Sequence, residues 1–302
     1  MANNPWRLLI TALLALFITS CDKSSDGDIN SASPVSAAQT QINDKLNAFT
    51  KAANSEASIN TYSLPDAFYK YRREVEPQLT STLTAYSVVN PGIFRKVSEQ
   101  LNQGLSLPGE LPQLDEAARQ YQASLDKMLP LSETLYAYSQ SKGWRNDNGA
   151  LARNSNAEYI ATFETLLIKR DNFLKAISVA NSEQIKMAYE NSEPNSAEHY
   201  RNGIVYLSRQ TLHALNENRT QSEEQVLNEQ AQTLSQLADG WSQLLQQQGY
   251  ESCQRIIDAA HDYISVLHSA IDQQAQGSEL PEEKIILPFN VLVQALTSHR
   301  SC

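Results

Sequence analysis

The sequence lacks the short motifs that most enzyme families place around a reactive group. Among its 302 residues there is no G-x-S-x-G segment, no Walker A loop, no G-x-G-x-x-G fingerprint and no C-x-x-C pair. The adjacent acidic residues at 223–224 and 282–283 stand at expected helix starts, where the helix dipole favours carboxylates, so they do not indicate a general acid–base pair. We therefore expect a protein that is not an enzyme and that uses no cofactor.

Positive charge is also scarce. The chain has 24 Lys and Arg against 34 Asp and Glu, which gives a formal net charge of −10 at pH 7. Nucleic-acid binding depends on clustered cations that neutralise phosphates, so a nucleic-acid partner is not expected. The same shortage argues against a folded surface that coats an anionic leaflet. Any membrane contact is therefore expected to come from a lipid.

The chain has no apolar run long enough to cross a bilayer, which takes about 20 residues. Residues 8–18 form a shorter apolar run after Arg7, as in the central region of a signal peptide. Small residues then lead into Cys21 as "ITSC", which resembles the bacterial lipobox, where a prolipoprotein is lipidated on the cysteine and cleaved just before it. We expect residues 1–20 to be a lipoprotein signal peptide and Cys21 to be lipidated. The alternative is an ordinary signal peptide with a coincidental cysteine.

The segment after Cys21 fits a lipid-anchored protein. Acyl chains such as palmitate would hold Cys21 on a membrane, because each buried CH₂ contributes about 0.8 kcal/mol and two or more chains attach stably. Residues 21–40 are rich in Ser, Asp and Ala and predict a flexible tether. In enteric-type bacteria, an aspartate after the lipidated cysteine is associated with the inner membrane. Asp22 therefore favours the inner over the outer membrane, with the folded part facing the periplasm.

Two further cysteines, Cys253 and Cys302, remain in the mature chain. The periplasm is oxidising, so such a pair is expected to form a disulfide where geometry permits. In the chain-entropy picture, closing a loop of about 50 residues stabilises the fold by roughly 4 kcal/mol. We expect this bridge to hold the C-terminus on the fold. The alternative is two unrelated thiols, one of them a buried apolar filler.

Beyond residue 40, apolar residues recur with the helical period, and almost nothing alternates with period two. One such stripe comprises Leu227, Ala231, Leu234, Ala238, Trp241 and Leu245. Ser155 with Glu158, and Ser196 after Pro194, predict the starts of two further helices. We expect residues 41–302 to form an all-α, antiparallel helical bundle of about six to eight helices. It forms either one domain or two helical lobes, with a sub-boundary near 190–196.

Three stretches of the chain resemble the YiiG-like family of bacterial lipoproteins, which carry an all-helical domain of unknown function. They are "KLNAFTKAAN" at 45–54, "LYAYSQSKGWRNDNGALARNSNAEYI" at 135–160 and "ILPFNVLVQAL" at 286–296. Phe49 departs from the pattern, because a tyrosine is expected there. The resemblance spans most of residues 41–300 and implies a periplasm-facing, all-helical lipoprotein. It implies no catalytic or ligand-binding residue, since none is established for the family.

Histidines are few, and one predicted helix holds the best candidates for a metal site. Asp258, His261 and His268 lie on one face of that helix, because seven residues make about two turns. A metal needs three or four converging ligands, normally from more than one element. No H-E-x-x-H segment and no pair of E-x-x-H segments accompanies them. We therefore expect histidines that are solvated or pack between helices and no metal, and we keep these three residues as the metal-binding alternative.

Tyrosine is the unusual component of the composition, with 13 residues. A group of aromatic and polar residues gathers at a predicted helix end and the loop that follows: Tyr136, Tyr138, Trp144, Arg145 and Asp147. Such loops can line a ligand cleft. Tyrosine at helical spacing also packs half-buried with its hydroxyl in water, and this architectural reading is the one we favour. The group remains a candidate ligand surface.

These observations favour a bacterial envelope lipoprotein with a non-catalytic binding or scaffolding role. Its expected partners are the membrane, through the lipid at Cys21, and an envelope protein whose identity the sequence does not give. The alternative function is a periplasmic module that binds a small ligand or a metal. A hydrolase is the remaining enzymatic alternative.

Overall fold

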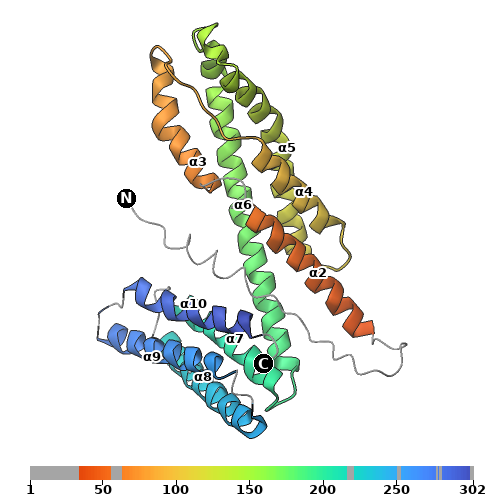
Figure 1. Ribbon diagram of the computed structural model, residues 1–302, viewed down its shortest axis with the longest axis vertical. Helices are drawn as coiled ribbons and strands as arrows, with labels where there is room; N and C mark the ends of the chain where they lie inside the picture. Colours follow the sequence, from red (N-terminus) through yellow and green to blue (C-terminus); the bar gives the residue numbers. More distant parts are fainter. Residues whose placement is uncertain are drawn as a thin grey trace. The chain divides into compact units, whose positions relative to one another are not determined.

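The computed structural model describes residues 34–55, 63–215, 221–249, 253–276, 278 and 281–299 (Figure 1). Over these residues the protein contains nine α-helices and no strand, so the predicted all-α bundle is confirmed. The prediction was about six to eight helices, and the ninth α-helix is one more than its upper figure. None of the described helices is both long and apolar enough to span a membrane.

The chain divides into two compact units, with the division between Ala180 and Asn181. The described elements of the N-terminal unit are α2 (Pro34–Asn54), α3 (Leu64–Lys70), the π-helix η2 (Tyr71–Val75), the 3-10 helix η3 (Glu76–Thr80), α4 (Gly92–Ser106), α5 (Pro112–Gln140), the 3-10 helix η4 (Gly143–Arg145) and most of α6 (Ala150–Asn191). The last turns of α6 belong to the C-terminal unit.

Helix α6 is the centre of the N-terminal unit (Figure 1). Its Phe163 and Phe173 are fully buried. Phe163 stacks on Phe68 of α3 with ring centroids 4.8 Å apart, and Phe173 meets Phe49 of α2 edge-on at 5.8 Å. Aromatic side chains bury large apolar areas, so this central column of rings contributes much of the apolar burial in the unit.

A non-helical segment joins η3 to α4. Residues 81–90, which we call the strap, contain no helix or strand and lie along α5 and α6 (Figure 1). Pro77 and Pro91 flank the segment, and proline in a helix interior removes a hydrogen bond and clashes with the preceding turn. The chain therefore crosses from η3 to α4 in an open conformation.

The C-terminal unit contains the end of α6 and the helices α7 (Ala197–Leu215), α8 (Gln221–Gln248), α9 (Gln254–Ala275) and α10 (Glu282–Ser298). From α7 onward each helix packs on the next. Trp241 and Tyr263 are fully buried, and Tyr263 meets Phe289 edge-on at 5.7 Å. Ser196 accepts a hydrogen bond from the His199 amide at 3.0 Å and so caps α7, as the sequence predicted. Segment 190–196 holds the end of α6 and the turn into α7.

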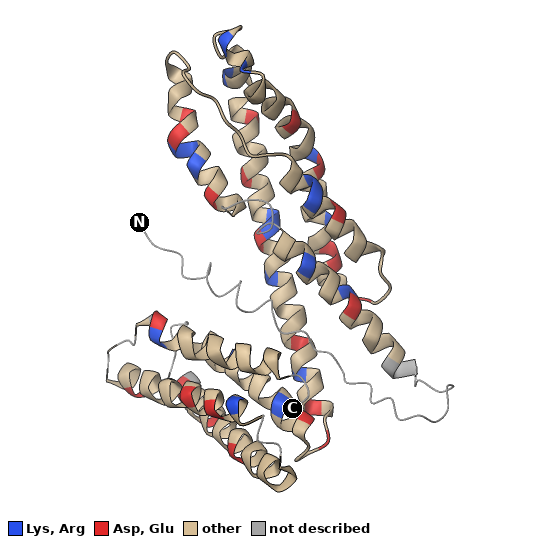
Figure 2. Ribbon diagram, viewed as in Figure 1, with Lys and Arg blue, Asp and Glu red and all other residues tan. Residues whose placement is uncertain are grey.

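Charge is distributed unevenly along the chain (Figure 2). Residues 181–302 carry 7 Lys and Arg against 16 Asp and Glu, whereas residues 21–180 carry 16 against 18. The C-terminal sequence therefore supplies most of the net negative charge. The N-terminal unit is close to neutral.

Candidate functional site

The strap packs against α5 and α6, and we call the surface that these two helices present to it the groove. Leu83, Tyr86 and Val89 of the strap are buried, whereas the residues between them are exposed or half-buried. Burial at every third residue is the pattern of a chain with three residues per turn, as in a polyproline II helix. The groove therefore accepts an extended chain that turns one face toward it.

Three side chains of the groove bind the backbone of the strap. Ser139 donates a hydrogen bond to the Tyr86 carbonyl at 2.8 Å, and Ser132 donates one to the Val89 carbonyl at 3.3 Å. The Val89 amide lies 3.5 Å from the Tyr159 hydroxyl, at the limit of a hydrogen bond. Ser132 and Ser139 are about 10.5 Å apart along α5, and three residues of an extended chain span about 9.3 Å. The spacing of the two serines along α5 therefore matches the length of three residues of the strap.

Tyrosine rings line the groove around Tyr86. The Tyr86 ring meets Tyr138 of α5 edge-on at 5.7 Å, and the rings of Tyr71 and Tyr159 lie 4.8 Å apart beside it. Tyr71 belongs to the π-helix η2 and donates a hydrogen bond to Asn156 Oδ1 at 2.7 Å. Single π-turns inside helices are rare and often occur at functional sites. Here the turn directs Tyr71 to the position where the strap passes.

The hydroxyl of Tyr86 is buried in this setting. The Tyr71 hydroxyl lies beside it and interacts with it. Burial raises the pKa of Tyr86 far above its usual value and raises that of Tyr71 to about 12. Both hydroxyls therefore stay protonated at neutral pH.

The candidate ligand surface predicted from the sequence is largely a loop-closing structure. Tyr138 donates a hydrogen bond to Asp147 Oδ1 at 2.5 Å, and Trp144 is buried. The Arg145 guanidinium lies 5.1 Å from the centre of the Trp144 ring, whereas Tyr136 is half-buried on α5. Of these five residues, Tyr138 lines the groove under the strap, and the others organise the turn between α5 and α6.

Asp147 precedes helix α6 and binds amides at its start. Its carboxylate accepts hydrogen bonds from the backbone amides of Gly149 at 2.8 Å and Leu151 at 3.0 Å. The Tyr138 hydroxyl, followed by these amides, lowers the pKa of Asp147, although partial desolvation opposes the shift. The predicted start at Ser155 was wrong, because Asp147 binds the first amides about two turns earlier and leaves Ser155 inside the helix.

The metal-binding alternative from the sequence lies on the exposed face of α9. Asp258, His261 and His268 are all exposed. His261 Nε2 lies 3.6 Å from Asp239 Oδ1 of α8, and Asp258 accepts a hydrogen bond from Gln254 at 3.0 Å. In the part of the chain that the structure describes, no group of three or more His, Cys, Asp or Glu side chains converges closely enough to hold a metal ion.

One serine and one histidine approach each other at the turn between α6 and α7. Ser192 Oγ lies 3.1 Å from His199 Nδ1, but it donates its own proton to the Tyr189 carbonyl at 2.6 Å. The Tyr189 ring packs on the imidazole with centroids 4.8 Å apart. In a catalytic pair the serine hydroxyl donates its hydrogen bond to the histidine that removes the proton. The Ser192 hydroxyl instead donates to a backbone carbonyl, so the pair has a structural role in the turn.

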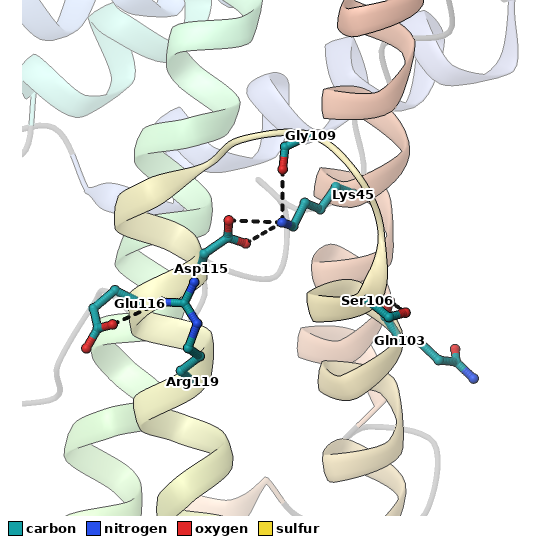
Figure 3. A network of polar contacts seen from close by, with 7 residues as sticks. All are labelled: Lys45, Gln103, Ser106, Gly109, Asp115, Glu116 and Arg119. Carbon is teal, nitrogen blue, oxygen red and sulfur yellow. Dashed lines mark hydrogen bonds and ion pairs between the residues drawn. The ribbon is translucent and has the colours of Figure 1, made fainter.

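A buried ion pair joins α2 to α5 (Figure 3). Lys45 Nζ lies 2.8 Å from Asp115 Oδ1 and 2.9 Å from Oδ2, and it also donates to the Gly109 carbonyl at 3.0 Å. The two side chains are only 6% and 10% exposed. Gly109 has a φ of +101°, which L side chains rarely adopt, and a Cβ there would lie 3.1 Å from the backbone of Gln41. The cluster is a clamp that fixes the α4–α5 turn to α2.

A protein-family model for a domain described as "Protein of unknown function (DUF3829)" matches residues 40–287. The chain belongs to this DUF3829 family. The match covers both compact units, and it includes the strap and its groove. No curated protein and no solved structure gives a significant match.

Membership of DUF3829 agrees with the expected helical domain of unknown function but assigns no site residue. Cys21 and Cys302 lie outside the described residues, and Cys253 is buried at the start of α9. The groove was missed in the sequence because no catalytic or metal motif marks it. Its signal was the spacing of three between Leu83, Tyr86 and Val89 in a segment that lacks helical periodicity.

Proposed function

We propose that this DUF3829 protein is a lipid-anchored lipoprotein of the bacterial envelope, similar to the YiiG-like lipoproteins, with a non-catalytic binding role in the periplasm. The anchor is Cys21, and Asp22 favours the inner membrane. The sequence "ITSC" after a short apolar run supports the anchor. The observation that supports a binding role is the groove, which already holds an extended chain by its backbone carbonyls.

The anchor is tested by labelling cells with radioactive palmitate. Wild-type protein should take up label and sediment with membranes, and Cys21→Ala should lose the label and leave the membrane fraction. Cys253→Ala is the matched control, because it removes a cysteine outside the lipobox and should keep its label. Unchanged membrane association of Cys21→Ala would contradict the anchor. Asp22→Ser should shift the protein toward outer-membrane fractions of a density gradient.

The binding role is tested by photo-crosslinking in cells. A photoreactive side chain at the exposed Thr84 of the strap should give a discrete adduct with an envelope protein, and one at the exposed Asp258 of α9 should not. The hydrolase alternative is less favoured, because the hydroxyl of Ser192, which lies beside His199, donates its hydrogen bond to a backbone carbonyl. A metal or small molecule retained at one equivalent in native mass spectrometry, with no adduct from Thr84, would favour the ligand-binding alternative.

We also propose that Cys253 and Cys302 form a disulfide in the mature protein. Cys253 is 2% exposed at the start of α9, where a bridge to the end of the chain would be shielded from reductants.

A further inference from the structure

The chain contains two Asn-Gly pairs, Asn148–Gly149 and Asn202–Gly203, and the structure places them in opposite settings. We propose that Asn148 is a site of spontaneous deamidation in the folded protein, promoted by the Arg153 guanidinium, and that Asn202 is protected from the same reaction. This modification is independent of the proposed binding role.

The reaction joins the side chain of Asn148 to the backbone amide that follows it. The Gly149 nitrogen loses its proton and attacks Cγ of Asn148, so that an N–Cγ bond forms, the Cγ–Nδ2 bond breaks and the amide group leaves as ammonia with that proton. Because glycine has no Cβ, the approach to Cγ is open. Water then opens the succinimide ring. Opening at Cγ gives aspartate, and opening at the main-chain carbonyl gives isoaspartate, whose main chain runs through Cβ and Cγ.

The backbone at Asn148 leaves this attack accessible. Asn148 is exposed in the turn between η4 and α6. Its φ is +55°, and that of Gly149 is +80°, so both residues lie in the left-handed region and outside the helical ladder. Rotation of the peptide between them can therefore bring the Gly149 nitrogen to Cγ without breaking a helix.

The second pair lies inside helix α7. The helical backbone there holds the Gly203 amide in the ladder and away from Cγ of Asn202. The side-chain amide of Asn202 donates a hydrogen bond to the Ala188 carbonyl at 3.2 Å, and Gly203 is buried. Attack at Asn202 therefore requires local opening of a packed helix, which costs free energy.

Two charged side chains act on the reacting peptide in opposite directions. The Arg153 guanidinium donates a hydrogen bond to the Asn148 carbonyl, which belongs to the same peptide group as the Gly149 nitrogen. When that nitrogen loses its proton, negative charge spreads to the carbonyl oxygen, where the cation stabilises it. Asp147 Oδ1 accepts a hydrogen bond from the Gly149 amide at 2.8 Å and so retains the proton. Asn148 should therefore react more slowly than in the unfolded chain but faster than Asn202.

The products change the start of α6. Both place a carboxylate directly after Asp147, which accepts hydrogen bonds from the amides of Gly149 and Leu151. Isoaspartate also adds one atom to the main chain between Asp147 and these amides, so the cap cannot keep its geometry. The modified protein should exchange the amide hydrogens of the first turn of α6 faster than the unmodified one.

The test incubates purified full-length protein in detergent at mildly alkaline pH and follows both Asn-Gly pairs by peptide mass spectrometry. In the folded protein, conversion at Asn148 should be at least about tenfold faster than at Asn202, and in urea the two rates should be similar. Arg153→Gln should slow conversion at Asn148 by at least about threefold and leave Asn202 unchanged. Arg145→Gln is the matched control, because it removes the same charge from the same turn and its guanidinium lies over the Trp144 ring.

Similar rates at Asn148 and Asn202 in the folded protein would overturn the proposal, as would no conversion at Asn148 while the sample in urea reacts. An unchanged or faster rate at Asn148 in Arg153→Gln would overturn the role of the guanidinium, because a looser turn without the cation would react faster and not more slowly. The wild-type comparison of the two pairs needs no variant, so it stands even if a variant folds poorly. All measurements use purified protein without a partner, so their failure is distinct from a failure of the proposed function.

Discussion

The ion pair between Lys45 and Asp115 is the sharpest test of how the N-terminal unit is held together. The Lys45 Nζ atom lies 2.8 Å from Oδ1 and 2.9 Å from Oδ2 of Asp115, and both side chains are almost fully buried. Removing one partner of a buried pair leaves an uncompensated charge and destabilises by about 3–5 kcal/mol. We expect Asp115→Ala and Lys45→Ala each to lower the free energy of unfolding of the N-terminal unit by this amount. The corresponding fall in Tm is about 6–20 °C.

A double replacement separates the charge from the packing. Lys45→Met combined with Asp115→Leu removes both charges and fills the space with apolar groups. Replacements of this kind are often neutral or stabilising by about 1–4 kcal/mol, so the double variant should be far more stable than either single one. Gly109 would lose its hydrogen bond from Lys45, so some stability should still be lost.

The assay is urea unfolding followed by circular dichroism, with hydrogen exchange of α2 and α5 to assign the transition to the N-terminal unit. The control is Glu116→Gln, which breaks an exposed pair with Arg119 on the same helix (Figure 3). Exposed pairs contribute little, so this variant should match the wild type. Single variants that change stability by less than about 1 kcal/mol, or a double variant as unstable as the sum of both, would refute the buried-charge argument.

Four further predictions follow from the contacts described above. Tyr86→Phe removes a buried hydroxyl that interacts with the Tyr71 hydroxyl and should destabilise by about 1 kcal/mol; an unchanged or raised Tm in a thermal melt would contradict this. Gly104→Ala should lower Tm although alanine favours helix, because its Cβ would lie 2.6 Å from the buried ring of Phe49. The lowered pKa of Asp147 means that its stabilising effect is present above its unfolded pKa and disappears as the pH falls through its folded pKa; a pH series of melts should therefore show less loss of stability in acid for Asp147→Asn than for the wild type. Cys253→Ser should lower Tm and leave the thiol at 302 open to a maleimide reagent, whereas a wild type that already reacts at both thiols would exclude the bridge.

The class of fold could be predicted from the sequence because helical stripes are long and repeat. The stripe from Leu227 to Leu245 gives a period without any knowledge of its partners, and the structure places it in the core of the C-terminal unit. The start of α6 could not be predicted in the same way. The sequence offers two plausible caps, one at Ser155 and one at Asp147. The contact with Tyr138 that favours Asp147 comes from another helix and cannot be read from the local sequence.

The candidate site was harder to predict because backbone contacts form it. Ser132 and Ser139 look like ordinary helix residues in the sequence, and their role depends on a strap more than 40 residues earlier. The π-helix that places Tyr71 has no recognised sequence signature. Residue types that can bind a metal, in contrast, are visible in the sequence, but their convergence in space is not. His261 and His268 are such residues, and the structure places both on the exposed face of one helix.

The continuity of α6 decides how the protein can be dissected. The division between the compact units falls between Ala180 and Asn181, inside a helix that runs on to Asn191. A truncation there would cut through the hydrogen-bond ladder, and it would leave carbonyls without helical partners at the end of the N-terminal fragment and amides without partners at the start of the C-terminal one. Each fragment would then fray at its new terminus. Truncation in the turn at 192–196 keeps α6 whole, so an N-terminal fragment that ends there is the better one to express alone.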